Sequence, residues 1–421
     1  MRQDEPLRTE IIAVGMELLG PHFRDTNSLY LTQKLEDLGL DVSFKTIVGD
    51  DWDNLTLSLR HSLSRADFVI ASGGLGPTTD DRTREALAHV LEKKLNFRED
   101  ILEAIRKRFE RRGMTMPAVN KKQAYVIEGA EVLENKNGTA PGLWLETGGK
   151  IILLLPGPPQ ELIPMFEESV WPKLQKLRNF FTSRTILKTT GLTESEIEER
   201  IFDLYPQSPE IRMSTLAYPG QIEIHLAARS PKNPAEAKKR LDRLQEAILD
   251  RLQDNVFSPE GKELEEVVGN LLRNNNKSLA TAESCTGGLL GNRITNVSGS
   301  SDYFLLGVVA YSNKAKVRLL DIPMRLIDEH GAVSLEVAQA MAAGVREKSQ
   351  TDLGLGITGI AGPTGGTPEK PVGLVYVALN SEKGSEVTKN LFLGNREAVK
   401  FQSTQRALDM IRRYLLKIKR P

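Results

Sequence analysis

The chain has 421 residues, more than one hydrophobic core usually organises, so two or three domains are expected. Its 56 basic side chains balance 56 acidic ones, which argues against a whole-chain attraction to nucleic acid or to an anionic membrane. The single cysteine excludes an internal disulfide and fits a reducing compartment. The first residues, MRQDEPLRTE, carry no apolar signal segment, and no apolar run is long enough to span a bilayer, so we expect a cytoplasmic protein.

The first predicted block, residues 1–172, alternates short apolar runs with helical patterns. The runs lie at 10–15, 42–48 and 67–72, and the helical patterns at 26–38, 53–64, 82–94 and 98–112. This alternation predicts right-handed βαβ units around a mostly parallel sheet. Binding sites in such sheets lie at the carboxyl ends of the strands.

Two further blocks follow. Residues 173–254 predict a small α+β unit without a chemical cluster, which we interpret as a spacer or dimerisation module. Residues 255–421 return to an α/β pattern. Their predicted strands lie at 278–283, 303–312, 352–359 and 373–379, and a long helix closes the chain at 395–418. The predicted fold is therefore two α/β three-layer domains with mostly parallel sheets, joined by a small α+β domain.

A glycine turn after the strand at 278–283 is the first candidate site. The sequence there, SCTGG, places Ser284 and Cys285 at the start of a helix, where unpaired backbone N–H groups favour a phosphate or an oxyanion. Thr286, Gly287 and Gly288 would then approach the ligand. Alternatively, Ser284 or Thr286 only caps the helix and Cys285 fills the core.

A serine nucleophile needs a base, and no histidine lies near this turn in the sequence. The next strand ends in AYSNKAK, so Tyr311 and Lys314 are expected at the same end of the sheet. A desolvated lysine can act as the base, and Tyr311 could hold it or relay a proton. The Gly- and Pro-rich loop at 358–373 could wall a nucleotide pocket.

A second glycine loop lies in the first block, where VIASGGLGPTTDDRT follows a strand. Gly73, Gly74 and Gly76 permit close backbone approach to a phosphate. Asp80 and Asp81 exceed what one helix cap needs, so they are candidate ligands for a divalent metal ion. Further metal candidates, Glu17 and Asp25, lie near the end of the first strand.

The last block resembles the carboxy-terminal domain of the competence/damage-inducible CinA family and, through it, the PncC nicotinamide mononucleotide deamidases. The motifs that carry the likeness, in chain order, are AESCTGG, GVVAYSNKAK, EHGAVS, GITGIAGPTGG with KPVG, and GNREAV. The resemblance implies a serine nucleophile, Ser284, with Lys314 as its partner and Tyr311 assisting. It also implies substrate contacts at Thr358, Gly359 and Arg396, and it requires no metal or other cofactor.

The first block resembles the MoaB/MogA fold of molybdopterin-binding proteins, and specifically the amino-terminal domain of CinA. GGLGPTTDDRT is the most telling motif. For this domain the resemblance implies a metal-dependent pyrophosphatase that acts on ADP-ribose. The expected ligands of the whole chain are thus nicotinamide mononucleotide and ADP-ribose, in a homodimer that binds neither membrane nor nucleic acid directly.

Two alternatives stay open. The first domain could bind molybdopterin or an adenylyl group, or the chain could be a non-catalytic adaptor in competence or DNA repair. The Ser284, Tyr311 and Lys314 set and the paired aspartates favour the bifunctional hydrolase over the adaptor.

Overall fold

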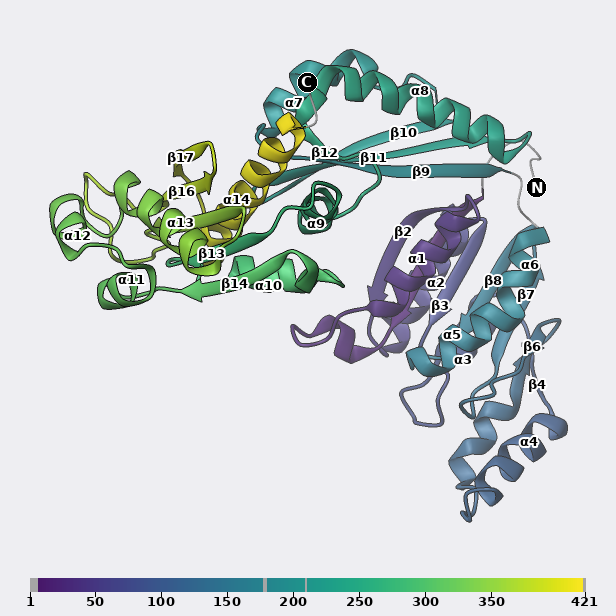
Figure 1. Ribbon diagram of the computed structural model, residues 1–421. Helices are drawn as coiled ribbons and strands as arrows, with labels where there is room; N and C mark the ends of the chain where they lie inside the picture. The colour runs from purple at the N-terminus through teal and green to yellow at the C-terminus, as the bar shows by residue number, and fades with distance from the viewer. Residues whose placement is uncertain (1–6, 177–179, 209, 419–421) are drawn as a thin grey trace. The chain divides into compact units, whose positions relative to one another are not determined.

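The computed structural model describes residues 7–176, 180–208 and 210–418 (Figure 1). The chain divides into two compact units. One holds the described residues up to Thr182 together with Arg229–Ala237, and the other holds Ser183–Ala228 and the described residues from Lys238 onward. No helix among the described residues is long and apolar enough to cross a membrane.

The first unit is built on a six-stranded sheet with the order β2-β1-β3-β8-β7-β6. Its strands are β1 (Arg8–Val14), β2 (Asp41–Val48), β3 (Phe68–Ser72), β6 (Glu131–Leu133), β7 (Gly142–Thr147) and β8 (Lys150–Leu155). The first four strands of that order are parallel, whereas β8, β7 and β6 pair antiparallel. A separate short pair joins β4 (Leu95–Phe97) to β5 (Tyr125–Ile127).

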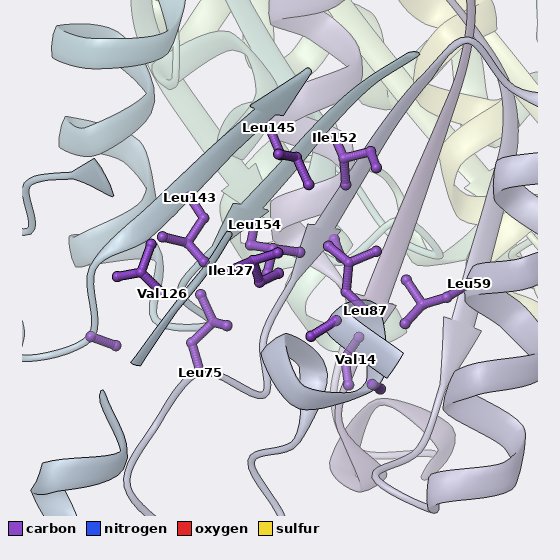
Figure 2. Packing of buried hydrophobic residues seen from close by; sticks show 14 of the residues in the cluster. Val14, Leu59, Leu75, Leu87, Val126, Ile127, Leu143, Leu145, Ile152 and Leu154 are labelled. Carbon is purple, nitrogen blue, oxygen red and sulfur yellow. The ribbon is translucent and has the colours of Figure 1, made fainter. Parts of the chain in front are cut away.

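Helices cover both faces of this sheet, because successive strand side chains point to opposite sides. On one face, Leu154 and its even-numbered neighbours on β8 pack with residues of α2 (Trp52–Arg65), α3 (Thr83–Val90) and α4 (Glu99–Glu110), as Figure 2 shows for part of the cluster. On the other face, Leu153 and its odd-numbered neighbours pack against α1 (Thr26–Asp37), α5 (Pro159–Met165) and α6 (Trp171–Lys176). The expected three-layer α/β domain is confirmed.

The middle sheet has the order β10-β11-β9-β12. Its strands are β9 (Phe181–Thr189), β10 (Ile211–Tyr218), β11 (Gln221–Ser230) and β12 (Val256–Ser258). Ile222, Ile224 and Leu226 face one side, where α7 (Glu194–Ile201) and α8 (Pro234–Leu252) cover them. Because β12 pairs with β9, this sheet extends to Ser258.

The last part of the chain forms a five-stranded sheet with the order β14-β13-β15-β16-β17. Its strands are β13 (Leu279–Glu283), β14 (Phe304–Val309), β15 (Leu353–Gly359), β16 (Leu374–Ser381) and β17 (Gly384–Leu391). Strands β14, β13 and β15 are parallel, and β16 and β17 continue antiparallel. The carboxyl ends of β13 and β14 therefore meet at one edge, where the expected site residues follow.

Two helical layers enclose this sheet as well. Leu279 of β13 packs with α9 (Leu264–Asn274), α10 (Leu289–Thr295) and α14 (Arg396–Ile418). Ala280 and Ala282 face α11 (Asn313–Leu320), α12 (Met324–His330) and α13 (Leu335–Ser349). A side chain on Gly356 of β15 would overlap the backbone of α13, so small residues on this face let that helix lie close to the sheet.

Candidate functional site: a serine–lysine pair at the end of a parallel strand

The SCTGG turn begins directly after β13, at the carboxyl edge of its sheet. The Ser284 N–H donates to the Ile357 carbonyl of β15 at 3.0 Å, and the Ala310 N–H donates to the Glu283 carbonyl at 2.8 Å. Both neighbouring strands therefore hold the turn at its start. Gly287 and Gly288 adopt positive φ angles of 63° and 92°, which lets the chain reverse into α10.

Lys316 is the amine that meets Ser284. Its Nζ lies 3.0 Å from Ser284 Oγ and 3.0 Å from the Ala310 carbonyl oxygen, and the Tyr311 carbonyl oxygen is 3.5 Å away. Lys316 is 1% exposed and Ser284 is 7% exposed, so the pair is almost closed to solvent. Ser284 continues the face of Ala280 and Ala282, the side of the sheet on which α11 packs.

Burial lowers the pKa of Lys316 from its ordinary value of 10.5. Among the described residues no carboxylate forms an ion pair with it, so only neutral oxygens offset the loss of water around the charged form. As a neutral amine, Lys316 has two N–H donors for the two carbonyls and one lone pair for the Ser284 hydroxyl proton. The geometry suits a general base.

Lys314, the lysine expected at this position, is exposed on α11. Residues two apart on a helix point about 200° away from each other, so Lys314 and Lys316 cannot face the same strand end. The prediction of Lys314 is therefore corrected to Lys316. One hint in the sequence is spacing: Lys316 lies four residues before the apolar Leu320, so the two share one side of α11, which the structure shows to be buried.

Cys285 points the other way, into the apolar cluster beneath α10 and α14. It is 7% exposed, and burial raises the pKa of its thiol to about 12. The thiolate is the nucleophilic form of cysteine, and it is scarce at neutral pH when the pKa is that high. Cys285 therefore packs in the core, on the opposite side of the strand from Ser284 and Lys316.

Glu283 is a residue that sequence analysis missed. Its carboxylate is 2% exposed and accepts the N–H groups of Gly288, Leu290 and Gly291 at 3.0, 3.0 and 2.8 Å. It thus supplies the negative charge that the start of α10 favours. Gly288 is consequently not free to hold an oxyanion.

The backbone N–H donors of the turn that remain unpaired in the described chain belong to residues before Gly287. Within the described residues, the N–H groups of Cys285 and Thr286 have no acceptor, whereas the Gly287 N–H donates to the Ser284 carbonyl at 3.1 Å. The Thr286 hydroxyl is fully buried and also lacks a described partner. These groups follow Ser284 directly and are the candidates for an oxyanion hole.

Two of the other residues expected in this domain have different places: Arg396 lies at the rim of the site, and Thr358 supports the backbone behind it. Arg396 donates from Nη2 to the Tyr311 hydroxyl at 3.2 Å and from Nη1 to the Gly362 carbonyl at 2.6 Å, so α14, the end of β14 and the Gly-rich loop meet. Thr358 is buried and donates to the Ala332 carbonyl at 2.7 Å, which gives it a supporting place. The Gly359 backbone runs close to Val375 of β16.

A second candidate site lies in the first unit, where a pocket of about 790 Å³ opens at the carboxyl ends of β1 and β3. It brings together all the residues that the sequence pointed to in this unit: Glu17, Asp25, Gly73, Gly74, Gly76, Asp80 and Asp81. Lys122, which the sequence did not indicate, fixes the loop by donating to the carbonyls of Thr78 and Asp81 at 2.6 Å each.

The carboxylates around this pocket do not form a metal cage by themselves. Asp25 accepts the Ser28 N–H at 2.9 Å as the cap of α1, and Asp81 accepts the Thr78 N–H at 2.9 Å. Nowhere in the part of the chain that the structure describes do three acidic, histidine or cysteine side chains group closely enough for a metal ion. An ion at this pocket would need further ligands from a bound substrate, as Mg²⁺ often does with phosphates.

Fold and sites together define a multidomain α/β protein with a buried serine–lysine pair in one domain and a glycine-lined pocket in another. Family models match three consecutive segments: "Probable molybdopterin binding domain" over residues 10–176, "Damage-inducible protein CinA KH domain" over 184–258, and "CinA C-terminal domain" over 261–415.

Whole-length relatives agree with these matches. The "CinA-like protein" of Koribacter versatilis is 46% identical over 97% of this chain and 99% of its own length, and that of Dictyoglomus thermophilum is 44% identical over 98% and 100%. A crystal structure of CinA from Thermoplasma acidophilum is 32% identical and covers 40% of this chain and 98% of that one, with a TM-score of 0.38. The chain belongs to the CinA family, so the resemblance predicted from the sequence motifs is confirmed.

The middle segment matches a KH domain. KH domains bind the nucleic-acid backbone through a Gly-x-x-Gly loop. Between residues 184 and 258 the sequence has glycines only at 191 and 220, so that loop is missing. That the chain does not bind nucleic acid directly stays a prediction. That it forms a homodimer also stays a prediction.

The Glu283 carboxylate yields a test of local stability. Glu283→Gln removes the charge that caps α10, and we expect the amides of Gly288, Leu290 and Gly291 to exchange about 5- to 100-fold faster, equivalent to about 1–3 kcal/mol. Hydrogen exchange read by mass spectrometry on this segment measures the change. The matched control is Glu382→Gln, at an exposed position between β16 and β17. Unchanged exchange at the start of α10 would contradict the capping role.

Proposed function

We propose that the carboxy-terminal domain hydrolyses a carboxamide and that its substrate is nicotinamide mononucleotide, which yields nicotinate mononucleotide and ammonia. The observation that carries the proposal is the 3.0 Å contact between Lys316 Nζ and Ser284 Oγ in a buried setting. A nucleophile hydrogen-bonded to a base is the arrangement that covalent hydrolysis requires. Family membership supports a hydrolase more generally.

The first half of the reaction transfers the acyl group to the serine. Neutral Lys316 takes the Ser284 hydroxyl proton while Oγ bonds to the amide carbon, and the N–H groups of Cys285 and Thr286 donate to the oxygen that becomes negative. Lys316 then gives its proton to the amide nitrogen, the carbon–nitrogen bond breaks and ammonia leaves. An ester between the acyl group and Ser284 remains.

The second half returns the enzyme to its starting state. Lys316 takes a proton from water, the water oxygen attacks the ester carbon, and the bond to Ser284 Oγ breaks. The serine recovers its proton from Lys316, and the acid product gives its remaining proton to solvent and leaves as a carboxylate. One water is consumed for each amide that is cleaved.

The assignment of nucleophile and base is tested by two matched pairs of variants. Ser284→Ala and Lys316→Met should each lower ammonia release from nicotinamide mononucleotide by at least about 1,000-fold, because each removes a reacting group. Cys285→Ala and Lys314→Met should stay within about threefold of the unmodified protein, since Cys285 packs in the core and Lys314 faces solvent. Activity retained by Ser284→Ala, or lost equally in both lysine variants, would overturn the assignment.

The pH dependence follows from the lowered pKa of Lys316. Only the neutral amine can accept the serine proton, so kcat/KM should rise with pH and level off once Lys316 is deprotonated. Half of the maximum should be reached below pH 10.5, because burial lowers the pKa. Lys316→Arg should stay inactive across the range, since the guanidinium keeps its proton. A profile that falls over the range in which Lys316 loses its proton would contradict a lysine base.

We also propose, for the first unit, a metal-dependent ADP-ribose pyrophosphatase, supported by the 790 Å³ pocket that gathers the glycine loop with Asp25 and Asp81. A divalent cation would neutralise phosphate charge, and Asp80 and Asp81 are the chain's candidate ligands at the loop. The alternative, binding of molybdopterin or an adenylyl group, uses the same pocket.

The test compares two substrates and one pair of variants. We expect AMP release from ADP-ribose with Mg²⁺, loss of that release on chelation, and a loss of about 10- to 100-fold in Asp81→Asn. Asp53→Asn, at an exposed position on α2, serves as the control and should match the unmodified protein. If ADP-ribose is inert and the chain instead consumes ATP in the presence of molybdopterin, the alternative holds.

A further inference from the structure

Lys400 lies against the same turn that carries Ser284. A Cβ atom on Gly287 would have one neighbour within 4 Å among the described residues outside those adjoining it, Lys400 Nζ at 3.7 Å. Lys400 is half-buried on α14, and the turn that it faces begins three residues before Gly287. The ammonium group therefore lies beside the backbone that would hold a substrate.

This ammonium has no partner in the described part of the chain. No hydrogen bond or ion pair involves it, although Glu265 and Glu397 line the same cavity as Lys400. Arg293, which also lines that cavity, differs. It is buried and donates to Glu265, Thr404 and Gln405 at 2.6–2.8 Å. A cation without a counter-charge beside the backbone of the serine turn is free to pair with a bound anion.

A second cation stands one helical turn earlier. Arg396 and Lys400 are four residues apart at the start of α14, so they share one face, and like charges at that spacing repel. Arg396 is oriented by its bonds to Tyr311 and Gly362, which places it on the rim of the serine–lysine site. The first turn of α14 also favours negative charge.

The space next to Lys400 can take a nucleotide. The cavity that it lines has a volume of about 980 Å³, and Leu289, the first residue of α10, and Phe401 form part of its wall. Four carboxylates line it as well: Glu223 and Glu263 pair with Lys188, Glu265 pairs with Arg293, and Glu397 lies on α14. Ligand pockets usually measure about 300–1,000 Å³. Gly287 leaves its side-chain position open toward Lys400, so a ligand can approach the backbone there.

We propose that Lys400, together with Arg396, binds the phosphate monoester of the substrate and thereby selects phosphorylated carboxamides over neutral ones. The inference rests on the proposed deamidase function and names the specificity-determining residue of that site. Lys400 acts on binding and leaves the proton transfers to Lys316.

The experiment compares nicotinamide mononucleotide with nicotinamide riboside, which lacks the phosphate. Lys400→Met should raise KM for the mononucleotide about 10- to 100-fold with kcat within about twofold, because one charge-assisted contact is lost. Its kcat/KM for the riboside should not change, and Lys400→Arg should restore most of the affinity. Lys417→Met, an exposed lysine near the other end of α14, is the matched control. Equal effects on both substrates, or none on either, would refute the phosphate subsite.

A binding measurement separates this inference from the proposed function. Calorimetry of nicotinamide mononucleotide with Ser284→Ala, and with Ser284→Ala combined with Lys400→Met, needs no turnover. Weaker binding in the double variant supports the subsite even if the unmodified protein releases no ammonia, an outcome that would remove only the deamidase. Equal affinities in the two variants would refute the phosphate subsite. The deamidase proposal would then be judged by the activity measurements alone.

Discussion

The candidate site of the carboxy-terminal domain depends on one interaction, a lysine amine buried against a serine hydroxyl. Charged lysine is among the least tolerated groups in a protein interior unless a carboxylate accompanies it. In the described residues Lys316 has only Ser284 and the carbonyls of Ala310 and Tyr311 around its amine. The fold therefore favours the neutral amine, which is the form that can remove a proton from a serine.

The sheet supplies the conditions that this contact needs. Ala280, Ala282 and Ala310 leave the α11 side of the strand ends without bulky side chains, so Lys316 can reach Ser284 from the helix. On the opposite side, Glu283 neutralises the start of α10 and keeps its own charge away from the amine by pointing across the sheet. Strand alternation thus separates a carboxylate and an amine whose pairing would hold the lysine protonated.

Sequence patterns predicted the layers of the fold well, because hydrophobic periodicity reports which faces of a strand or helix are buried. The helices predicted at 26–38, 53–64 and 395–418 correspond closely to α1, α2 and α14. The site was predicted only in part. Ser284 follows from a local motif, whereas the choice between Lys314 and Lys316 depends on the rotational phase of α11, and a helix start misjudged by one or two residues moves every side chain to another face.

Contacts between residues far apart in the chain could not be predicted from the sequence, for a different reason. Lys400 lies more than one hundred residues after Gly287, and their approach is set by how α14 packs on the sheet, which no local pattern encodes. The role of Glu283 could not be predicted either. The sequence shows a glutamate at the end of a buried strand, but only the structure shows the three N–H groups that donate to it.

The two glycine loops look alike in the sequence but differ in what their missing side chains leave behind. Cβ atoms on Gly73 and Gly74 would overlap Val14 and Thr83, so these glycines let the loop pack on its own unit. In the described part of the chain, a Cβ atom on Gly287 would meet only the end of one lysine side chain. A glycine-rich turn therefore indicates first that the backbone must bend or pack closely. It points more directly to a ligand where the space left by the absent side chain is open, as it is between the serine turn and Lys400.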